Sequence, residues 1–434
     1  MLQVCSVMRT TLPARLRAVV SVAACLCLAG SCVRMPDAIP PEVDVAGDLN
    51  AVLDAATGSR ADPGCTMELI VDRPEARRVL LEMLRSASDH IHVETLSFDN
   101  DEAAFPPQGV EFLDLLAARL AAGVRVKLLL DPLAQHFWSD GAWLDTLRAQ
   151  GAEVLFHWTP AGLNAADPLL FHQHKKLVVV DGREAIVGGM NFGLPWFGHD
   201  ADRDTIVRLA GPVVGTLQRE FLADWTALGG APGPPEGDFP PSAATGDVRV
   251  RAIDQRPSAG DFDINALMQI ALRRARRRVD LTAPYFNPTP WLADELRAAA
   301  ARGVAVRVLT NARDSSDQPT SYFAAAWWFG PMLDGGVQVF VWDRPGSLLH
   351  SKTMVADDEL AMVGSYNSNW RSIAWDAENA VVFTDAGAVR QVADMIAADF
   401  AAECVRPVTR EWLDAVAPSE AAGWSLVHLF GWVF

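Results

Sequence analysis

The chain has 434 residues, half of them hydrophobic, which is enough for two or three domains with large apolar cores. Its formal net charge is −17 and its isoelectric point is about 4.9. Nucleic-acid binding depends on basic side chains that neutralise phosphates, so this charge disfavours a nucleic-acid partner.

Residues 1–31 are predicted to be an export signal. Arginines precede an uncharged apolar run over residues 18–30, which is too short to span a bilayer comfortably but fits a signal sequence. Cys32 follows three small residues, an arrangement that resembles the lipidation site of bacterial lipoproteins, with Cys25 as a rival site. We therefore expect an exported, membrane-associated protein; an uncleaved anchor and an ordinary secretory signal are the alternatives.

The remaining chain is predicted to consist of two domains. Residues 32–62 are rich in proline, alanine and aspartate and are expected to form a flexible tether. The first domain then covers residues 63–228, a proline- and glycine-rich linker 229–246, the second domain 247–415, and an amphipathic tail 416–434. Cys65 and Cys404 are the cysteines that remain after the signal, and an oxidising compartment would favour a disulfide between them.

One combination of polar residues occurs twice with every spacing kept. It consists of His174, Lys176, Asp181 and Asn191 in the first half, and of His350, Lys352, Asp357 and Asn367 in the second. The chain holds only four lysines, yet each copy keeps a lysine two residues after its histidine. A generic charged surface does not produce such a repeat, so we interpret it as a duplicated functional motif.

Each copy is predicted to fold as a hairpin. The segment from His174 to about Val180, with its apolar run 177–180, predicts a buried strand, Asp181 begins a turn, and a second strand returns toward the histidine. Because side chains alternate along a strand, His174 and Lys176 are expected to share one face and Lys175 the other. An imidazole, an ammonium and a carboxamide on one surface suit acid–base or nucleophilic chemistry on a phosphate.

The duplication extends beyond these motifs. Residues 123–131 resemble 303–311, and 151–156 resemble 336–341, at nearly constant offsets. Each of these strand-like segments alternates with helical, alanine-rich stretches. We therefore expect two related α/β domains, each with strands and helices in alternation.

The two motifs resemble the paired HKD motifs of the phospholipase D superfamily, over residues 66–415, and the flanking sequences resemble bacterial cardiolipin synthases. Those flanks include Gly188-Gly189-Met190-Asn191, Gly364-Ser365-Tyr366-Asn367 and Glu378-Asn379-Ala380. The resemblance implies that each domain is a mixed sheet flanked by helices, and that the two pack around one shared active site. It also implies a phosphatidyltransferase that acts on phosphatidylglycerol at a membrane surface.

The resemblance, together with the residue types, suggests a role for each side chain. His174 is expected to attack phosphorus and His350 to act as acid and base, an order that the sequence alone cannot fix. Asp204 and Glu378 are candidates to orient the histidines. The remaining assignments are phosphate contacts from Lys176, Lys352, Asn191, Asn367 and Ser365, of which Ser365 is replaced by Gly189 in the first copy. Asp181 and Asp357 complete the catalytic motifs but are expected to serve structure, since each lies at the far end of its strand.

Two other functions remain open at this point. A hydrolytic phospholipase D would share every catalytic residue, and a lipid-binding lipoprotein with a dead site would need none of them. No cofactor is expected, and no cysteine–histidine spacing predicts a metal site; the chain is expected to be a monomer. Trp327, Trp328 and the tail are predicted either to anchor in a membrane interface or to pack in the core.

Overall fold

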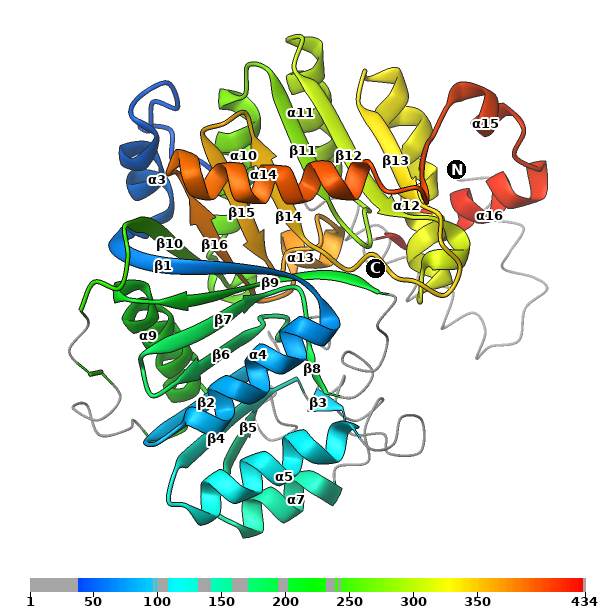
Figure 1. Ribbon diagram of the computed structural model, residues 1–434. Helices are drawn as coiled ribbons and strands as arrows, with labels where there is room; N and C mark the ends of the chain where they lie inside the picture. The colour runs from blue at the N-terminus through cyan, green and yellow to red at the C-terminus, as the bar shows by residue number, and fades with distance from the viewer. Residues whose placement is uncertain are drawn as a thin grey trace, which may run out of the picture.

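The protein is described from a computed structural model, which covers residues 38–96, 98–99, 108–131, 142–157, 171–193, 202–231, 239–240 and 243–431. The predicted export signal and the predicted lipidation residue Cys32 lie outside these residues. Fifteen strands form one continuous mixed sheet, and helices cover its faces (Figure 1).

The strands fall into two sets that correspond to the two halves of the sequence. The first half contributes β1 (Ala61–Asp72), β2 (His90–Thr95), β4 (Arg125–Leu130), β5 (Glu153–Phe156), β6 (Leu177–Val180), β7 (Glu184–Gly188) and β9 (Arg203–Ala210). The second contributes β10 (Val248–Gln255), β11 (Arg278–Thr282), β12 (Ala305–Asn311), β13 (Gln338–Trp342), β14 (Thr353–Ala356), β15 (Leu360–Gly364), β16 (Glu378–Phe383) and β17 (Val405–Pro407). A separate two-stranded sheet joins β3 (Phe98–Asp99) to β8 (Phe192–Gly193).

The order of the strands confirms the predicted duplication. From the centre outward the first half runs β1-β9-β7-β6-β2-β4-β5, and the second runs β10-β16-β15-β14-β11-β12-β13, with β17 added at the edge. The halves meet at β1, whose first residues pair with β10 and whose remaining residues pair with β9, both antiparallel. Each strand of the first half thus has a counterpart in the second, as expected for two phospholipase D-like domains.

The helices lie between and outside these strands. In the first half they are α4 (Arg73–Ser86), α5 (Gln108–Ala121), α7 (Ala142–Ala149) and α9 (Pro212–Ala227). In the second they are α10 (Asp263–Arg274), α11 (Pro290–Ala301), α12 (Pro319–Asp334), α13 (Trp370–Ala374) and α14 (Ala386–Phe400), with 3₁₀ turns η1 (Pro257–Ala259) and η2 (Arg313–Ser315). Helix α3 (Leu49–Thr57) precedes both halves, and α15 (Arg410–Asp414) and α16 (Pro418–His428) follow them.

Strand alternation explains why the central strands are apolar throughout. On β6, Val178 packs toward α4 and α5, whereas Val179 packs into a core that contains residues of both halves. On β15, Met362 and Val363 divide in the same way between the outer core and the shared core. A strand buried on both faces needs a continuous apolar run, which is the pattern that the sequence shows. The shared core includes residues of α9, of α14 and of strands from both halves, and it holds the halves together.

The flexible tether predicted for residues 32–62 does not hold for the described part of that segment. Helix α3 begins after Asp48, whose carboxylate accepts a hydrogen bond from the Ala51 amide over 3.0 Å, and it ends at Gly58 in the left-handed conformation. Val52 and Leu53 are buried in the core of the second half. This segment forms a helix because its apolar residues recur at helical spacing. The overall composition of residues 32–62, on which the prediction of a tether was based, does not show this spacing.

The predicted disulfide between Cys65 and Cys404 is wrong for this structure, in which both thiols are free. Cys65 lies on β1 at the centre of the sheet, whereas Cys404 lies beside β17 at its edge. The eight strand steps between them correspond to roughly 40 Å along the sheet. A disulfide requires its two Cα atoms within about 7 Å. Flanking the folded region in sequence did not bring the cysteines together in space.

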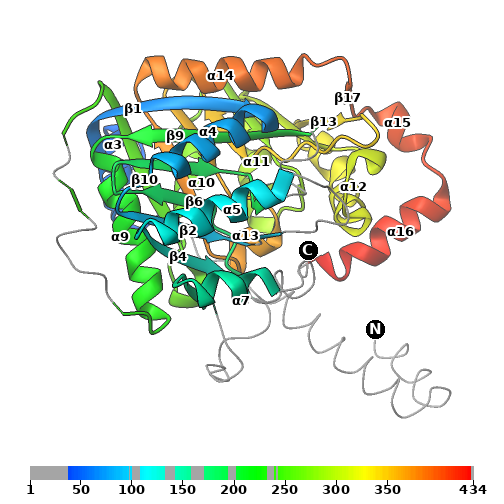
Figure 2. The ribbon, with the colours of Figure 1, turned by 60° about the horizontal axis from the view of Figure 1, so that its bottom comes forward.

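The predicted tail 416–434 contains α16, which follows α15 and packs along α12 (Figure 2). Trp328 and Trp424 are buried, and the half-buried Trp327 stacks on the ring of His428 with centroids 3.4 Å apart. Of the two alternatives for the tryptophan pair, the structure therefore shows core packing. Within the described residues, every helix is too short or too polar to cross a bilayer.

Candidate active site

The two repeated histidines lie where β6 and β14 begin, on the seam between the halves. His174 and Lys176 immediately precede β6, and His350 and Lys352 immediately precede β14. All four side chains are at least nine-tenths buried. The hairpins predicted from the sequence are present as β6–β7 and β14–β15.

Each histidine is held by a carboxylate from the opposite half. His174 Nδ1 lies 2.9 Å from Glu378 Oε2, and His350 Nδ1 lies 2.8 Å from Asp204 Oδ2. Both carboxylates are fully buried. A carboxylate on Nδ1 fixes the tautomer with its proton on that nitrogen, so that Nε2 keeps its lone pair for the reaction. Both candidates, Asp204 and Glu378, thus contact a histidine. Each contacts the histidine of the other half, a crossed arrangement that the sequence did not predict.

Backbone hydrogen bonds reinforce this crossing. The His174 amide donates to the Ala377 carbonyl over 2.9 Å, and the His350 amide donates to the Arg203 carbonyl over 2.7 Å. Ala377 and Arg203 each directly precede the carboxylate that holds that histidine. Backbone hydrogen bonds therefore help to position each histidine beside its carboxylate.

Electrostatics keep both imidazoles neutral. Burial, together with the adjacent Lys352, lowers the pKa of His350 to about 3, although Asp204 opposes this shift. Burial and Lys176 likewise lower the pKa of His174 well below its ordinary value. Neutral imidazoles can accept a proton or attack an electrophile at neutral pH.

The pKa values of the two dyad carboxylates are shifted in opposite directions. Burial raises the pKa of Glu378 to about 7, although Lys176 and two hydroxyl donors oppose it. Burial also acts to raise the pKa of Asp204, but His350 and Lys352 outweigh it and the pKa falls below its ordinary value. Asp204 is therefore the more firmly ionised partner.

The pKa values of both motif lysines are lowered. Lys176 Nζ donates to the His174 carbonyl, and Lys352 Nζ to the His350 carbonyl, each over 2.6 Å. Burial lowers the pKa of Lys176 to about 8 and that of Lys352 to about 7. An arriving phosphate would supply the negative charge that favours their protonated form.

Of the predicted phosphate contacts, the asparagines remain available and the serine does not. Asn191 is buried and its carbonyl oxygen accepts a hydrogen bond from Thr95 over 3.3 Å. The side-chain oxygen of Asn367 is buried without a hydrogen-bond partner in the described structure. Ser365 instead donates its hydroxyl to Glu378, so the phosphate contact expected of it is replaced by support of the His174 dyad.

Gly189 stands in the first motif where the second motif has Ser365, and the packing around Asp204 explains this difference. A Cβ atom at Gly189 would collide with Asp204 Oδ1. The shorter aspartate thus occupies the space that a serine would need, whereas at Ser365 the hydroxyl meets the longer Glu378 as a donor. The two half-sites are therefore related but chemically distinct.

Asp181 and Asp357 lie at the opposite ends of their strands from the histidines, as expected. Asp181 accepts hydrogen bonds from the backbone amides of residues 88–90, and Asp357 from those of residues 276–278, all between 2.8 and 2.9 Å. Both residues have φ of 52°. They fix each hairpin turn to the start of the neighbouring strand and do not contact the dyads.

The structure also shows contributions that the sequence analysis missed. The hydroxyl of Ser372 donates a second hydrogen bond to Glu378 over 2.5 Å. The ring of Tyr285 packs edge-on against His350 with centroids 5.9 Å apart. Ser372 lies within a Trp370-Arg371-Ser372 stretch that also resembles the cardiolipin synthase flanks, which was the available signal. Lys175 points away from the motif residues, as alternation predicts, but is buried between Asp224 and Asp254.

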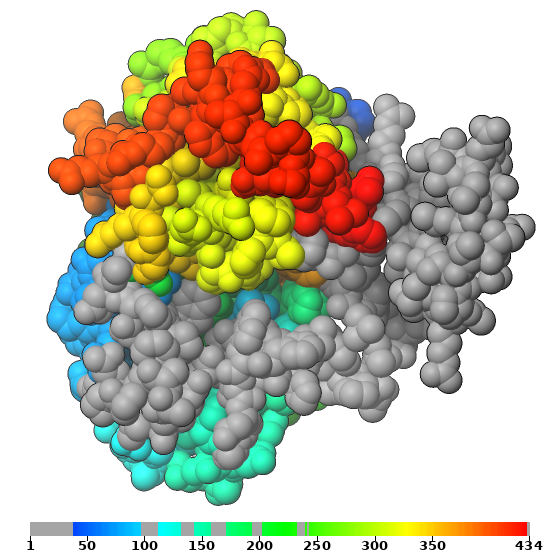
Figure 3. Space-filling view, turned by 90° about the vertical axis from the view of Figure 1, so that its right-hand side faces the viewer, coloured from blue at the N-terminus to red at the C-terminus, as the bar shows by residue number. Residues whose placement is uncertain are grey.

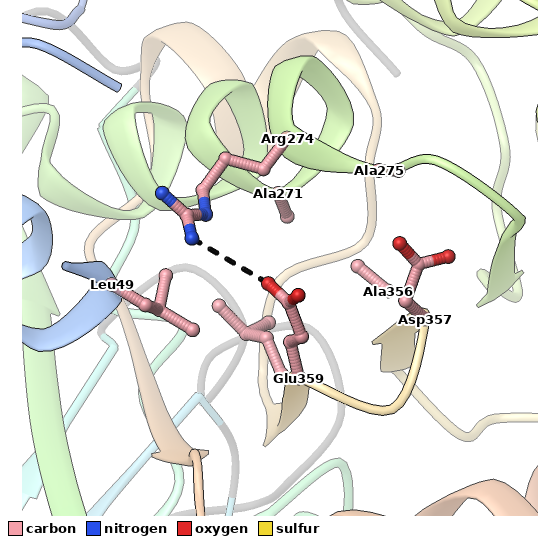
Figure 4. A pocket seen from close by; sticks show the side chains of 8 residues that line it. Leu49, Ala271, Arg274, Ala275, Ala356, Asp357 and Glu359 are labelled. Carbon is pink, nitrogen blue, oxygen red and sulfur yellow. Dashed lines mark ion pairs between the residues drawn. The ribbon is translucent and has the colours of Figure 1, made fainter. Parts of the chain in front are cut away.

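A pocket at the Asp357 end of β14 does not belong to the reactive centre (Figure 4). Its lining includes Leu49, Ala356 and the ion pair between Arg274 and Glu359, which are 3.5 Å apart, but neither histidine. From His350 to Asp357 the chain advances roughly 23 Å. In the described ranges, no group of three or more histidine, cysteine, aspartate or glutamate side chains could hold a metal.

Comparisons with known proteins agree with this geometry. The chain matches the family model described as "Cardiolipin synthase, PLD-like domain" over residues 80–225 and 268–401. Cardiolipin synthase A of Pseudomonas syringae pv. syringae is 30% identical over 338 residues, which cover 77% of this chain and 68% of that protein. The major cardiolipin synthase ClsA of Bacillus subtilis is 29% identical over 73% of this chain and 65% of its own length.

The chain thus spans about two thirds of the length of these relatives. A similar solved structure is that of phosphatidylserine synthase from Haemophilus influenzae Rd KW20, with a TM-score of 0.65 and 14% identity over 85% of this chain and 95% of that one. At this identity the likeness shows a shared fold.

Proposed function

This chain belongs to the phospholipase D-like family of cardiolipin synthase domains, and on that premise we propose that it is a phosphatidyltransferase that makes cardiolipin from phosphatidylglycerol. The observation that carries the proposal is the pair of crossed histidine–carboxylate dyads, each with a buried lysine. Two imidazoles at one seam suit a reaction in which one attacks phosphorus and the other carries protons.

In the first step, Nε2 of His174 attacks the phosphorus of phosphatidylglycerol and the bond to the head-group glycerol oxygen breaks. The negative charge of the bound phosphodiester raises the pKa of His350, so His350 takes up a proton from solvent when the substrate binds. It gives this proton to the departing oxygen, so free glycerol leaves and phosphatidyl-histidine remains. The lysines and the side-chain NH₂ group of Asn367 would donate hydrogen bonds to the phosphoryl oxygens and stabilise the developing charge.

In the second step, a head-group hydroxyl of another phosphatidylglycerol gives its proton to His350. The resulting oxygen nucleophile attacks phosphorus, the phosphorus–nitrogen bond breaks, and cardiolipin forms with His174 regenerated. The ionised Asp204 beside His350 supports this assignment, because an anion stabilises the imidazolium form from which His350 gives its proton.

A mass-spectrometric product assay tests the proposal. The purified chain is incubated with phosphatidylglycerol vesicles, and cardiolipin and glycerol are expected in equal amounts. His174→Gln and His350→Gln should form neither. Phosphatidic acid as the main product would identify a hydrolase instead, and no turnover of any phospholipid would favour the lipid-binding lipoprotein.

We propose further that the chain is exported and membrane-associated. The support is the sequence of its first 32 residues, where arginines precede an apolar run and then Cys32. Metabolic labelling with a fatty acid should mark the wild-type chain, and Cys32→Ser should abolish the label. Persistence of the label in that variant would point to Cys25.

A further inference from the structure

The outer surface of α16 is apolar. Among the described residues, the large hydrophobic side chains that are more than a third exposed are Val71, Trp412, Leu426, Leu429 and Phe430. Four of these five belong to the last segment of the chain, and Leu426 and Leu429 are 61% and 62% exposed. Single exposed hydrophobic residues are ordinary, but Leu426, Leu429 and Phe430 lie together at the end of α16, and such a group indicates an interaction surface.

The part of this helix that carries the exposed apolar residues has no compensating charge. After Glu420 the sequence contains no aspartate, glutamate, lysine or arginine. One side of α16 packs on α12, where His428 stacks on Trp327. The side chains of Ser425, Leu426 and Leu429 are exposed to solvent. A surface helix of a soluble domain usually has a charged outer face. Its absence here favours an apolar environment for the exposed side.

The end of α16 lies beside the candidate active site. The side-chain amide of Asn287 donates to the Gly431 carbonyl over 2.8 Å, directly after α16. Asn287 is two residues from Tyr285, whose ring packs against His350. Figures 2 and 3 show the C-terminal helix on the surface next to α12. The apolar end of α16 is therefore close to the segment that contacts His350.

We propose that the face formed by Leu426, Leu429 and Phe430 docks on the apolar interior of a lipid bilayer and brings the active site to the membrane surface. This inference rests on the proposed function, because a membrane phospholipid substrate is what requires the site to face a bilayer. An uncharged face inserts among acyl chains without the desolvation cost that charged side chains would impose.

The mode of binding follows from the charge distribution. The chain is strongly acidic, so attraction to anionic head groups does not drive docking at this face. The basic residues Arg276 and Arg277 lie at the Asp357 end of β14, away from the histidines. Docking through that end would turn the active site away from the lipid. Binding through α16 is therefore expected to persist in high salt, where electrostatic attraction is screened.

An activity comparison tests the docking face. The full chain carrying Leu426→Ser, Leu429→Ser and Phe430→Ser is assayed on vesicles of equal phosphatidylglycerol and phosphatidylcholine, and on monomeric dihexanoyl phosphatidylglycerol. We expect a loss of about tenfold or more on vesicles, since three apolar contacts are removed, and less than about a twofold change on the monomeric lipid. The matched control, Arg276→Ser with Arg277→Ser, should retain both activities.

Hydrogen exchange of the full chain supplies an independent measurement. Vesicles should protect the amides of residues 421–431 equally at about 0.1 M and about 0.5 M salt, because apolar docking does not depend on charges that the added salt screens. Unchanged exchange there, together with full vesicle activity of the triple variant, would overturn the inference while leaving the proposed function intact. Protection that depends on protein concentration without vesicles, with a doubled mass, would assign the face to a second copy. If the wild-type chain turns over neither lipid, the proposed function itself fails, and vesicle protection then decides the docking face alone.

Discussion

His350 of the second half is hydrogen-bonded through Nδ1 to Asp204 of the first half over 2.8 Å. The reciprocal contact joins His174 to Glu378, so neither half contains a complete dyad. A single half would lack the carboxylate that orients its histidine. The crossing makes the two halves one catalytic unit.

Removing the charge that orients a histidine should reduce activity with little change in fold. Asp204→Asn is expected to lower kcat by about 10³–10⁴, because the amide can hold the wrong tautomer and does not stabilise the imidazolium. Steady-state kinetics on phosphatidylglycerol, with thermal unfolding as control, measures this. A near-normal kcat in the Asp204→Asn variant would show that His350 does not carry the proton.

Replacing either motif lysine should reduce activity. Lys176→Ala and Lys352→Ala are each expected to lower kcat by about 10²–10³, since each removes a charged donor to the transferring phosphate. Their folded structures should persist, as circular dichroism would report. Wild-type rates in either variant would contradict a phosphate contact.

For Lys175 the structure revises the prediction from alternation alone. Its ammonium is buried against Asp224 and Asp254, so Lys175→Ala should leave buried carboxylates uncompensated. We expect a loss of about 3–5 kcal/mol in the free energy of unfolding, measured by urea titration. Arg60→Ala, which removes an exposed pairing to Asp54, is the control and should cost less than about 1 kcal/mol.

The hairpin aspartates should affect stability before chemistry. Asp357→Ala removes the acceptor for three backbone amides and is expected to cost about 2–3 kcal/mol or more. Below its melting temperature the variant should retain kcat within a few-fold. A large loss of kcat in a fully folded Asp357→Ala variant would assign this residue to catalysis after all.

Gly189 should not accept the residue found at the matching place in the second motif. Gly189→Ser would put a Cβ atom against the Asp204 carboxylate and displace it from His350. Activity should fall by at least about a hundredfold, comparable to loss of the dyad. Ser365→Gly leaves a space instead of a clash, so it should be the milder of the two changes in a side-by-side assay.

Stability should rise with pH through the range in which the two active-site lysines titrate. Their folded pKa values, about 8 for Lys176 and about 7 for Lys352, lie below the ordinary value of 10.5. Between about pH 7 and 10 the unfolded chain binds their protons and the folded chain progressively does not, so raising the pH favours folding. Urea unfolding at about pH 6.5 and about pH 9 should show this gain, and Lys176→Met with Lys352→Met should reduce it. Phosphate, which binds the protonated forms, should stabilise the wild type more at the lower pH.

The sequence by itself determined the duplicated motif, the α/β class, the hairpins and the direction of each motif side chain, because these depend on local spacing and on strand alternation. It also placed Asp181 and Asp357 away from the chemistry, since turn and strand lengths are local. It could not assign Glu378 to His174 and Asp204 to His350, because hydrogen bonds across the seam depend on how the two halves pack. The same limit explains the free cysteines, the helix in the expected tether and the role of Ser365. Contacts between residues far apart in sequence are selected by burial in a shared core, and only the tertiary structure specifies which polar groups that core brings together.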